Sequence, residues 1–220
     1  MSDSNAAKRS VMLKCAIFAA LFIAAYIASK FIDSHAFKLS RYVVLAIAGI
    51  VLFHDVFAEG LKDWKAYPLK NAFWVLGGIL GITVAQVIGA IPQGIFYPDY
   101  SDINSDNVAN AMQVLSPLVY IPVMGILGPI AEEVFFRLLV VHKLRSKIPV
   151  AVCIILSALL FTCYHMHAVS LPEFVSCLPH GASGAVFAFV MAKRKNLVTN
   201  CAVHVIFNLM CLLVYSLGPA

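Results

Sequence analysis

Seven long apolar segments, separated by polar stretches, dominate the sequence. Each is close to the roughly 20 residues that a helix needs to cross a bilayer. Transmembrane β-strands would be shorter and would alternate apolar with polar residues, which these segments do not. The sequence therefore predicts an all-α, polytopic transmembrane helix bundle, folded as a single integral membrane domain over residues 1–220. Its seven spans cover about 11–32, 42–58, 71–91, 114–136, 148–168, 174–192 and 196–216.

Two stretches complicate this division. Gly128 and Pro129 fall inside the fourth segment, and a break at this point would raise the span count to eight. Residues 92–113 are rich in Pro, Asp, Asn and Ser and are predicted to form the one long loop, with a short interfacial helix near Val108–Gln113.

Composition supports the membrane class. Hydrophobic residues make up 61% of the chain and charged residues 12%, and the mean hydropathy is +0.88. A soluble domain of average composition carries roughly twice this charged fraction, so most of the surface is expected to contact lipid. No basic tract is dense enough to indicate a nucleic-acid partner. The six cysteines form no C-x-x-C pair and are interpreted as free thiols in apolar surroundings.

The basic residues predict an orientation. If the amino terminus is cytoplasmic, thirteen of the sixteen lysines and arginines lie in cytoplasmic segments, and Lys30, Lys38 and Arg41 lie outside. Cytoplasmic segments of membrane proteins carry the excess of Lys and Arg. The amino terminus is therefore expected in the cytoplasm, and the long loop and the carboxyl terminus on the other side.

Ionisable residues inside apolar segments are the candidates for chemistry, because charge in lipid is costly unless it is paired or functional. Glu132 and Glu133 are adjacent in the fourth segment. Arg137 follows Glu133 by four residues, on the same helix face, so the two are expected to form an ion pair. Glu132 points about 100° away and has no local partner. The alternative interpretation is a charge cluster at a helix end.

Two later segments add polar groups. His165 follows Phe161 by one helical turn, and His204 and Asn208 share one helix face. These residues could also serve as satisfied interfacial or inter-helix polar groups. Together with Glu132, however, they form a set that can hydrolyse an amide. A glutamate can take a proton from water, and histidine and asparagine can stabilise an oxyanion.

No metal or other cofactor is expected. The H-E-x-x-H motif of helical zinc proteases is absent, as is a serine in G-x-S-x-G. Two histidines with one glutamate could bind zinc in principle, but direct catalysis by the carboxylate is favoured.

The three groups together resemble the CPBP family, which contains the CaaX prenyl proteases of type II and bacterial bacteriocin-processing or self-immunity proteins. The pattern is E-E-x-x-x-R, F-x-x-x-H and H-x-x-x-N. Here it reads Glu132-Glu133 to Arg137, Phe161 to His165, and His204 to Asn208, within a motif-bearing core at residues 114–216.

The resemblance implies a metal-free intramembrane glutamic endopeptidase in a bacterial plasma membrane. Glu132 and His165 would activate water, His204 and Asn208 would form the oxyanion site, and Glu133, Arg137 and Phe161 would support them. The family site opens to the cytoplasm, whereas the predicted topology places His165 toward the outer end of its segment.

The expected substrates are membrane-borne, prenylated or precursor peptides. Two other functions stay open: a catalytically silent scaffold or immunity protein of the same fold, and a small transporter. The oligomeric state is not predicted.

Overall fold

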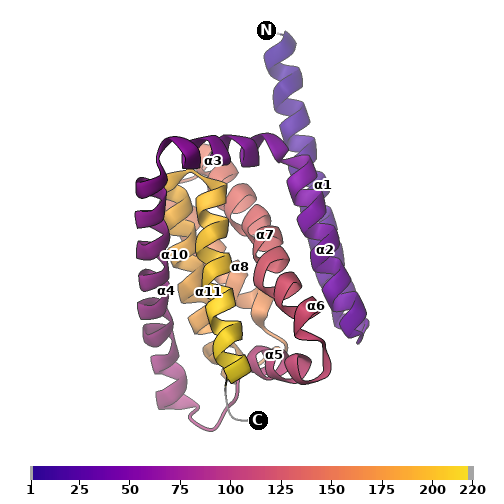
Figure 1. Cartoon of the computed structure of the whole chain (residues 1–220), viewed down its shortest axis with the longest axis vertical. Coiled ribbons are helices and arrows are strands. Elements are labelled where there is room, and N and C mark those ends of the chain that lie inside the picture. Colours follow the sequence, from indigo (N-terminus) through magenta and orange to yellow (C-terminus); the bar gives the residue numbers. More distant parts are fainter. Residues whose placement is uncertain (1, 218–220) are drawn as a thin grey trace.

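Long helices running side by side form the body of the molecule (Figure 1). The computed structural model describes residues 2–217, and this part of the chain contains helices and connections but no strand. The elements are α1 (Ser2–Phe31), α2 (His35–Leu52), α3 (His54–Ala66), α4 (Pro68–Phe96), α5 (Ile103–Val114), α6 (Pro117–Pro122), η1 (Val123–Leu127), α7 (Gly128–Glu132), η2 (Glu133–Lys143), η3 (Leu144–Ser146), α8 (Val150–His165), α9 (Leu171–Ser176), α10 (Leu178–Arg194) and α11 (Leu197–Leu217).

The bundle has two distinct ends. Helix α3 lies across one end, and α5 closes part of the other, where α11 also finishes (Figure 1). We call these the α3 end and the α5 end. Polar side chains cap the N-termini of two helices: Ser34 caps α2 and Asp102 caps α5, and each accepts hydrogen bonding from backbone N–H groups.

In the part of the chain that the structure describes, four helices are long and apolar enough to cross a membrane: Arg9–Phe31 in α1, His35–Leu52, Pro68–Phe96 and Leu197–Val214 in α11. The other long passes are the run from α6 to η2, together with α8 and α10. α8 packs against α10 and exposes Val152, Ile155 and Leu159 on another face. α10 contacts both α4 and α8 extensively. The outer face of α4 exposes Phe73, Leu80 and Val87, among other large apolar side chains, as a lipid-facing helix would.

Close helix contacts set the position of the site. A Cβ atom on Gly184 of α10 would lie 3.1 Å from the Phe161 side chain of α8, and one on Gly89 of α4 would lie 2.9 Å from the Pro179 backbone. Small residues of this kind let membrane helices approach closely. Aromatic rings fill the contact between α1 and the fourth pass, where Phe22 of α1 stacks on Phe135 with ring centroids 4.3 Å apart.

The prediction of an all-α polytopic bundle is confirmed, but several predicted bounds were wrong. The segment predicted at 42–58 is two helices, because α2 ends at Leu52 and α3 turns across the bundle end. In the stretch predicted as a loop, α4 continues to Phe96, and the short helix predicted near Val108–Gln113 is part of the twelve-residue helix α5.

Gly128 and Pro129 do not break the fourth segment. Both residues lie in a continuous right-handed helical run, and the N–H of Gly128 donates to the Val123 carbonyl five residues back. The carboxyl-terminal residues 218–220, predicted to lie outside the cell, fall outside the described part of the chain.

Candidate active site

Glu132 and Glu133 lie in the middle of the fourth pass, where α7 meets the π-helical segment η2. π-helical turns are rare and frequently occur at functional sites. Both carboxylates are buried, with 6% of Glu132 and none of Glu133 exposed. Glu133 Oε1 lies 3.5 Å from Arg137 Nη1, which is the ion pair that the spacing predicts.

Arg137 is fully buried among aromatic rings. Its guanidinium carbon lies 4.4 Å from the centre of the Phe161 ring and 4.9 Å from that of Phe187, and Nη2 donates to the Gly184 carbonyl at 3.4 Å. A guanidinium is attracted to ring faces, and this attraction grows when water is excluded. Phe161 therefore packs directly against the cation that holds Glu133.

His204 of α11 connects the two glutamates. Its Nδ1 lies 2.9 Å from Glu133 Oε1, and its Nε2 lies 3.7 Å from Glu132 Oε2. Asn200, one turn earlier on α11, donates from Nδ2 to the other oxygen of Glu133. Glu133 thus has three partners from two helices. Among the residues that the structure describes, Glu132 has one ion-pair contact, the longer one with His204.

His165 ends α8 and takes its orientation from two neighbours. Its Nδ1 lies 2.8 Å from the Phe161 carbonyl, one turn earlier. Its ring stacks on that of His180 from α10, with centroids 4.4 Å apart and planes 8° from parallel. A carbonyl can only accept, so Nδ1 carries the hydrogen and Nε2 of the neutral ring offers a lone pair. Within residues 2–217, no direct hydrogen bond joins His165 to Glu132.

The structure brings Glu132, His165, His204 and Asn208 to the wall of one cavity of about 680 Å³. Asn208 approaches it from α11, and its Nδ2 donates weakly to the Met124 carbonyl at 3.5 Å. The four polar groups from three passes are therefore available to a single bound molecule.

Three further residues of the cavity wall were not identified from the sequence. The hydroxyl groups of Tyr42 and Tyr164 lie 3.0 Å apart, and Arg41 Nη2 donates to the Tyr42 hydroxyl at 3.0 Å. All three line the cavity beside Glu132. No short-range spacing connects α2 with α8, so the sequence carried no signal for this group. Asn200 was also missed, although its place four residues before His204 could have indicated it.

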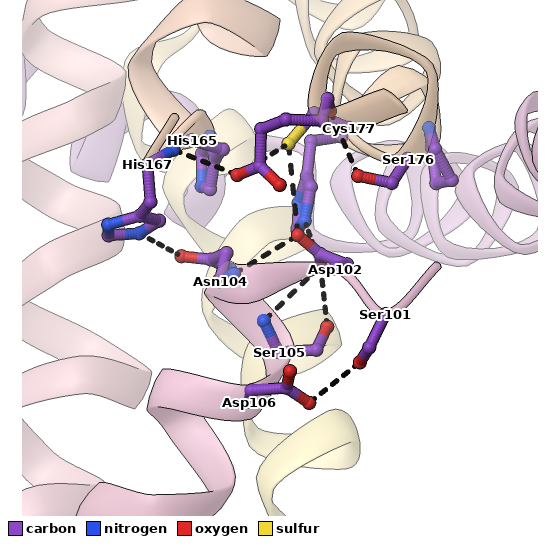
Figure 2. A network of polar contacts seen from close by, with 12 residues as sticks. Ser101, Asp102, Asn104, Ser105, Asp106, His165, His167, Ser176 and Cys177 are labelled. Carbon is purple, nitrogen blue, oxygen red and sulfur yellow. Dashed lines mark hydrogen bonds and ion pairs between the residues drawn. The ribbon is translucent and has the colours of Figure 1, made fainter. Parts of the chain in front are cut away.

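A polar network borders the cavity at the α5 end (Figure 2). Asp102 Oδ2 lies 3.4 Å from His180 Nε2 and accepts from the Ser105 hydroxyl at 2.7 Å. Burial opposes ionisation of Asp102, but the hydrogen bonds from His180 and Ser105 hold its pKa below the usual range. Asp102 is thus linked through His180 to the stacked ring of His165.

The same network contains the candidate metal ligands among the described residues. One ligand atom from each of Asp102, Glu173 and Cys177 lies within 4.8 Å of the others. Their oxygen atoms already accept hydrogen bonds, because Asp102 caps α5 and Glu173 accepts from the His167 backbone at 2.8 Å and from the Tyr100 hydroxyl at 3.0 Å. These bonds give the group a structural role, because Glu173 of α9 holds the connections before α5 and after α8. It is separate from the Glu132–His204 contact.

Comparison with known proteins finds a family match in the motif-bearing region. Residues 114–210 match the family described as "Type II CAAX prenyl endopeptidase Rce1-like". The chain is 25% identical over 169 residues to the "Putative membrane peptidase YdiL" of Bacillus subtilis (strain 168), a match that covers 76% of this chain and 66% of that protein.

A second relative is the "UPF0177 protein YxdF" of Lactococcus lactis subsp. lactis (strain IL1403). It is 25% identical over 153 residues, which cover 68% of this chain and 78% of that protein. No solved structure gives a significant match.

Proposed function

Because residues 114–210 belong to the Rce1-like family of type II CAAX prenyl endopeptidases, we propose that this chain is an intramembrane endopeptidase in which Glu132 activates water. The observation that carries this proposal is the unequal pairing of two adjacent carboxylates. Glu133 contacts Arg137, His204 and Asn200, whereas Glu132 lines the cavity with His204 Nε2 at 3.7 Å as its nearest ionic contact. A carboxylate with few partners is the better placed general base.

In the proposed reaction, water attacks the scissile carbonyl carbon and gives one proton to the Glu132 carboxylate. The carbonyl oxygen becomes an oxyanion. When the carbon–nitrogen bond breaks, Glu132 returns this proton to the leaving amine, and the base is regenerated. Water is thus divided between the new carboxyl and amino termini, and no cofactor enters the balance.

In its protonated form, His204 is placed to stabilise the oxyanion. Glu133 accepts from Nδ1 and is the natural counter-ion of the imidazolium, so Nε2–H can donate into the cavity. Asn208 Nδ2 lies on the same helix face, one turn later, and supplies a second donor. One such donor typically increases kcat by a factor of about 10²–10³.

His165 would orient the attacking water. With Nδ1–H bonded to the Phe161 carbonyl, its Nε2 can accept a hydrogen from a water that also contacts Glu132. The expected substrates are membrane-borne or lipidated peptides, and the relatives in two bacteria support a bacterial plasma membrane as the location.

The proposal is tested with purified protein in proteoliposomes that also contain a library of membrane-borne peptides. New peptide termini are identified by mass spectrometry for the unsubstituted chain, Glu132→Gln and Glu59→Gln. Glu59 is exposed on α3 and provides the matched control for the same chemical change. We expect Glu132→Gln to lose about 10²–10⁴ in rate or more, and Glu59→Gln to lose nothing.

A single turnover in H₂¹⁸O separates a base from a nucleophile. One ¹⁸O atom is expected in the new carboxyl terminus and none in Glu132. Label in Glu132 would indicate a covalent acyl intermediate instead. Cleavage that persists in Glu132→Gln would show that this residue is not catalytic.

A further inference from the structure

We propose that the catalytic cavity opens on the non-cytoplasmic face of the membrane, in contrast to the cytoplasmic opening that the family resemblance implies, so that its substrates are peptide chains presented from that side and not lipidated proteins of the cytosol. This inference rests on the proposed peptidase function for the nature of the substrate. It is carried by the distribution of charge between the two ends of the bundle and by the residues that line the cavity.

The basic side chains gather at the α3 end, in short connections and the helix ends beside them. Cytoplasmic loops of membrane proteins carry an excess of Lys and Arg within about 15–20 residues of the spans. Arg9 and Lys14 lie toward the start of α1, which projects beyond α3 at the same end (Figure 1). The basic residues of the α3 end are Lys62, Lys65, Lys70, Lys143, Arg145, Lys147, Lys193, Arg194 and Lys195.

The α5 end has the opposite character. Its three basic residues are Lys30, Lys38 and Arg41, and each has a local partner. Lys38 pairs with Asp33 at 2.8 Å, Lys30 donates to the Met166 carbonyl at 2.9 Å, and Arg41 donates to the Ser29 hydroxyl at 2.8 Å. The carboxylates at this end outnumber them; they are Asp33, Asp99, Asp102, Asp106 and Glu173. The α3 end is therefore the cytoplasmic end.

The cavity extends from the α5 end to the middle of the bundle. Its outer wall comes from the α1–α2 connection, the start of α2 and α5, with Lys38, Asn107 and Asn110 among the lining residues. Its inner wall comes from Glu132 and His204. None of the nine basic residues of the α3 end lines it. A molecule that reaches Glu132 through this mouth therefore comes from the side opposite the basic connections.

The chemistry of the mouth fits a peptide main chain. Amide side chains of α5 line it, namely Asn104, Asn107 and Asn110, and each can both donate and accept hydrogen bonds. Met124, Phe207 and Leu212 add apolar lining to the cavity. An exported peptide, or the outer end of a membrane-anchored one, would satisfy both regions.

The orientation is tested by thiol labelling of the full chain in a bacterial membrane. Asn107→Cys places a thiol at the exposed mouth, and Ser146→Cys places a matched thiol in the exposed connection of the α3 end. A membrane-impermeant maleimide is applied to intact spheroplasts and to sealed inverted vesicles. The unsubstituted chain, with Cys163 exposed, sets the background.

We expect the Asn107→Cys thiol to react in spheroplasts and the Ser146→Cys thiol only in inverted vesicles. The reverse pattern, or labelling of both from both sides, overturns the inference. If neither thiol reacts above background, alkaline phosphatase and green fluorescent protein are each fused after residue 217. Active phosphatase supports the orientation, and fluorescence overturns it.

The labelling reports orientation and needs no catalysis, so a wrong orientation and a wrong peptidase assignment give different results. Glu132→Gln should label as the unsubstituted chain does. Cleavage dependent on Glu132 together with labelling from the cytoplasm would keep the peptidase and reject the outward cavity. Peptides added outside intact spheroplasts should be cleaved only when Glu132 is present, and cleavage that requires permeabilisation would reject the outward cavity.

Discussion

The molecule holds two polar clusters, one partly exposed and one buried, that are built from similar residues and differ in how completely they are paired. At the α3 end, Asp63 accepts from Arg194, from Asn71 at 3.0 Å and from Asn196 at 2.8 Å. Asn71 Oδ1 in turn accepts from Thr199 at 2.6 Å. In mid-bundle, Glu133 is equally well bound, but its neighbour Glu132 is not.

This difference in pairing distinguishes a structural cluster, which holds helices together at the α3 end, from the reactive site in mid-bundle. Each polar group named in the α3-end cluster bonds to a group on another helix, and none of them lines the cavity. The central cluster leaves Arg137 Nε and Asn200 Oδ1 without a hydrogen bond and directs one carboxylate to the cavity. Structures retain incomplete pairing of this kind where chemistry needs it.

The largest expected effect comes from Glu133→Gln. Removing this charge leaves Arg137 buried without its counter-ion, which typically costs about 3–5 kcal/mol. It also removes the anion that holds His204. We expect a strong loss of folded yield, and a smaller loss of turnover per folded molecule than in Glu132→Gln. Thermal unfolding in detergent and active-site-normalised rates measure the two effects. The opposite ranking of turnover would exchange the roles of the two glutamates.

A smaller effect is expected from His180→Ala, which removes the ring stacked on His165. A misplaced catalytic group can cost about 10²-fold in rate, so we expect a fall in kcat up to that size with little change in KM. His180→Phe keeps a flat ring in this place and should recover part of the rate. Equal loss in both variants would argue that the contact with Asp102, and not the stack, is what matters.

These contacts mark the limit of what the sequence could predict. The Glu133–Arg137 and His204–Asn208 pairs follow from helical spacing, and the cost of charge in lipid singles out Glu132. The stack of His165 on His180 joins two helices whose relative rotation no local pattern fixes. Similarly, hydropathy detects that residues 42–58 are apolar but cannot show that the chain turns at Phe53, where α3 begins to lie across the bundle.

Asp63→Asn should act on stability alone. The hydrogen bond from Arg194 lowers the pKa of Asp63 to about 2, because its effect outweighs that of desolvation, which raises the pKa. A lowered folded-state pKa stabilises the protein above the ordinary pKa, and this contribution is lost as pH falls from about 4 toward 2. We expect a loss of about 1 kcal/mol for this partly exposed cluster, with unchanged kcat. Unfolding curves at pH 7 and pH 3 should differ less for Asp63→Asn than for the unsubstituted chain.

The smallest effect is expected from a strong chelator. The proposed base and oxyanion donors need no ion, so the cleavage rate should be unchanged after treatment and dialysis. The Asp102, Glu173 and Cys177 group lies outside the Glu132–His204 contact, and an ion there would affect stability first. Loss of cleavage that added zinc restores would reject the metal-free mechanism.

The π-helical segment that begins at Glu133 has a consequence for how this protein changes over generations. A π turn accommodates one more residue than an α turn, so a single deletion between Val134 and Lys143 could be absorbed by a return to ordinary helix. A deletion absorbed in this way leaves the later side chains of the pass in place. Even a deletion before Arg137 leaves this residue three positions after Glu133 instead of four, where the two side chains can still pair. A deletion in α8, which is ordinary α-helix, would instead rotate every later side chain by about 100° and turn His165 away from His180. Length variation among descendants should therefore be tolerated in the π-helical segment and eliminated in α8.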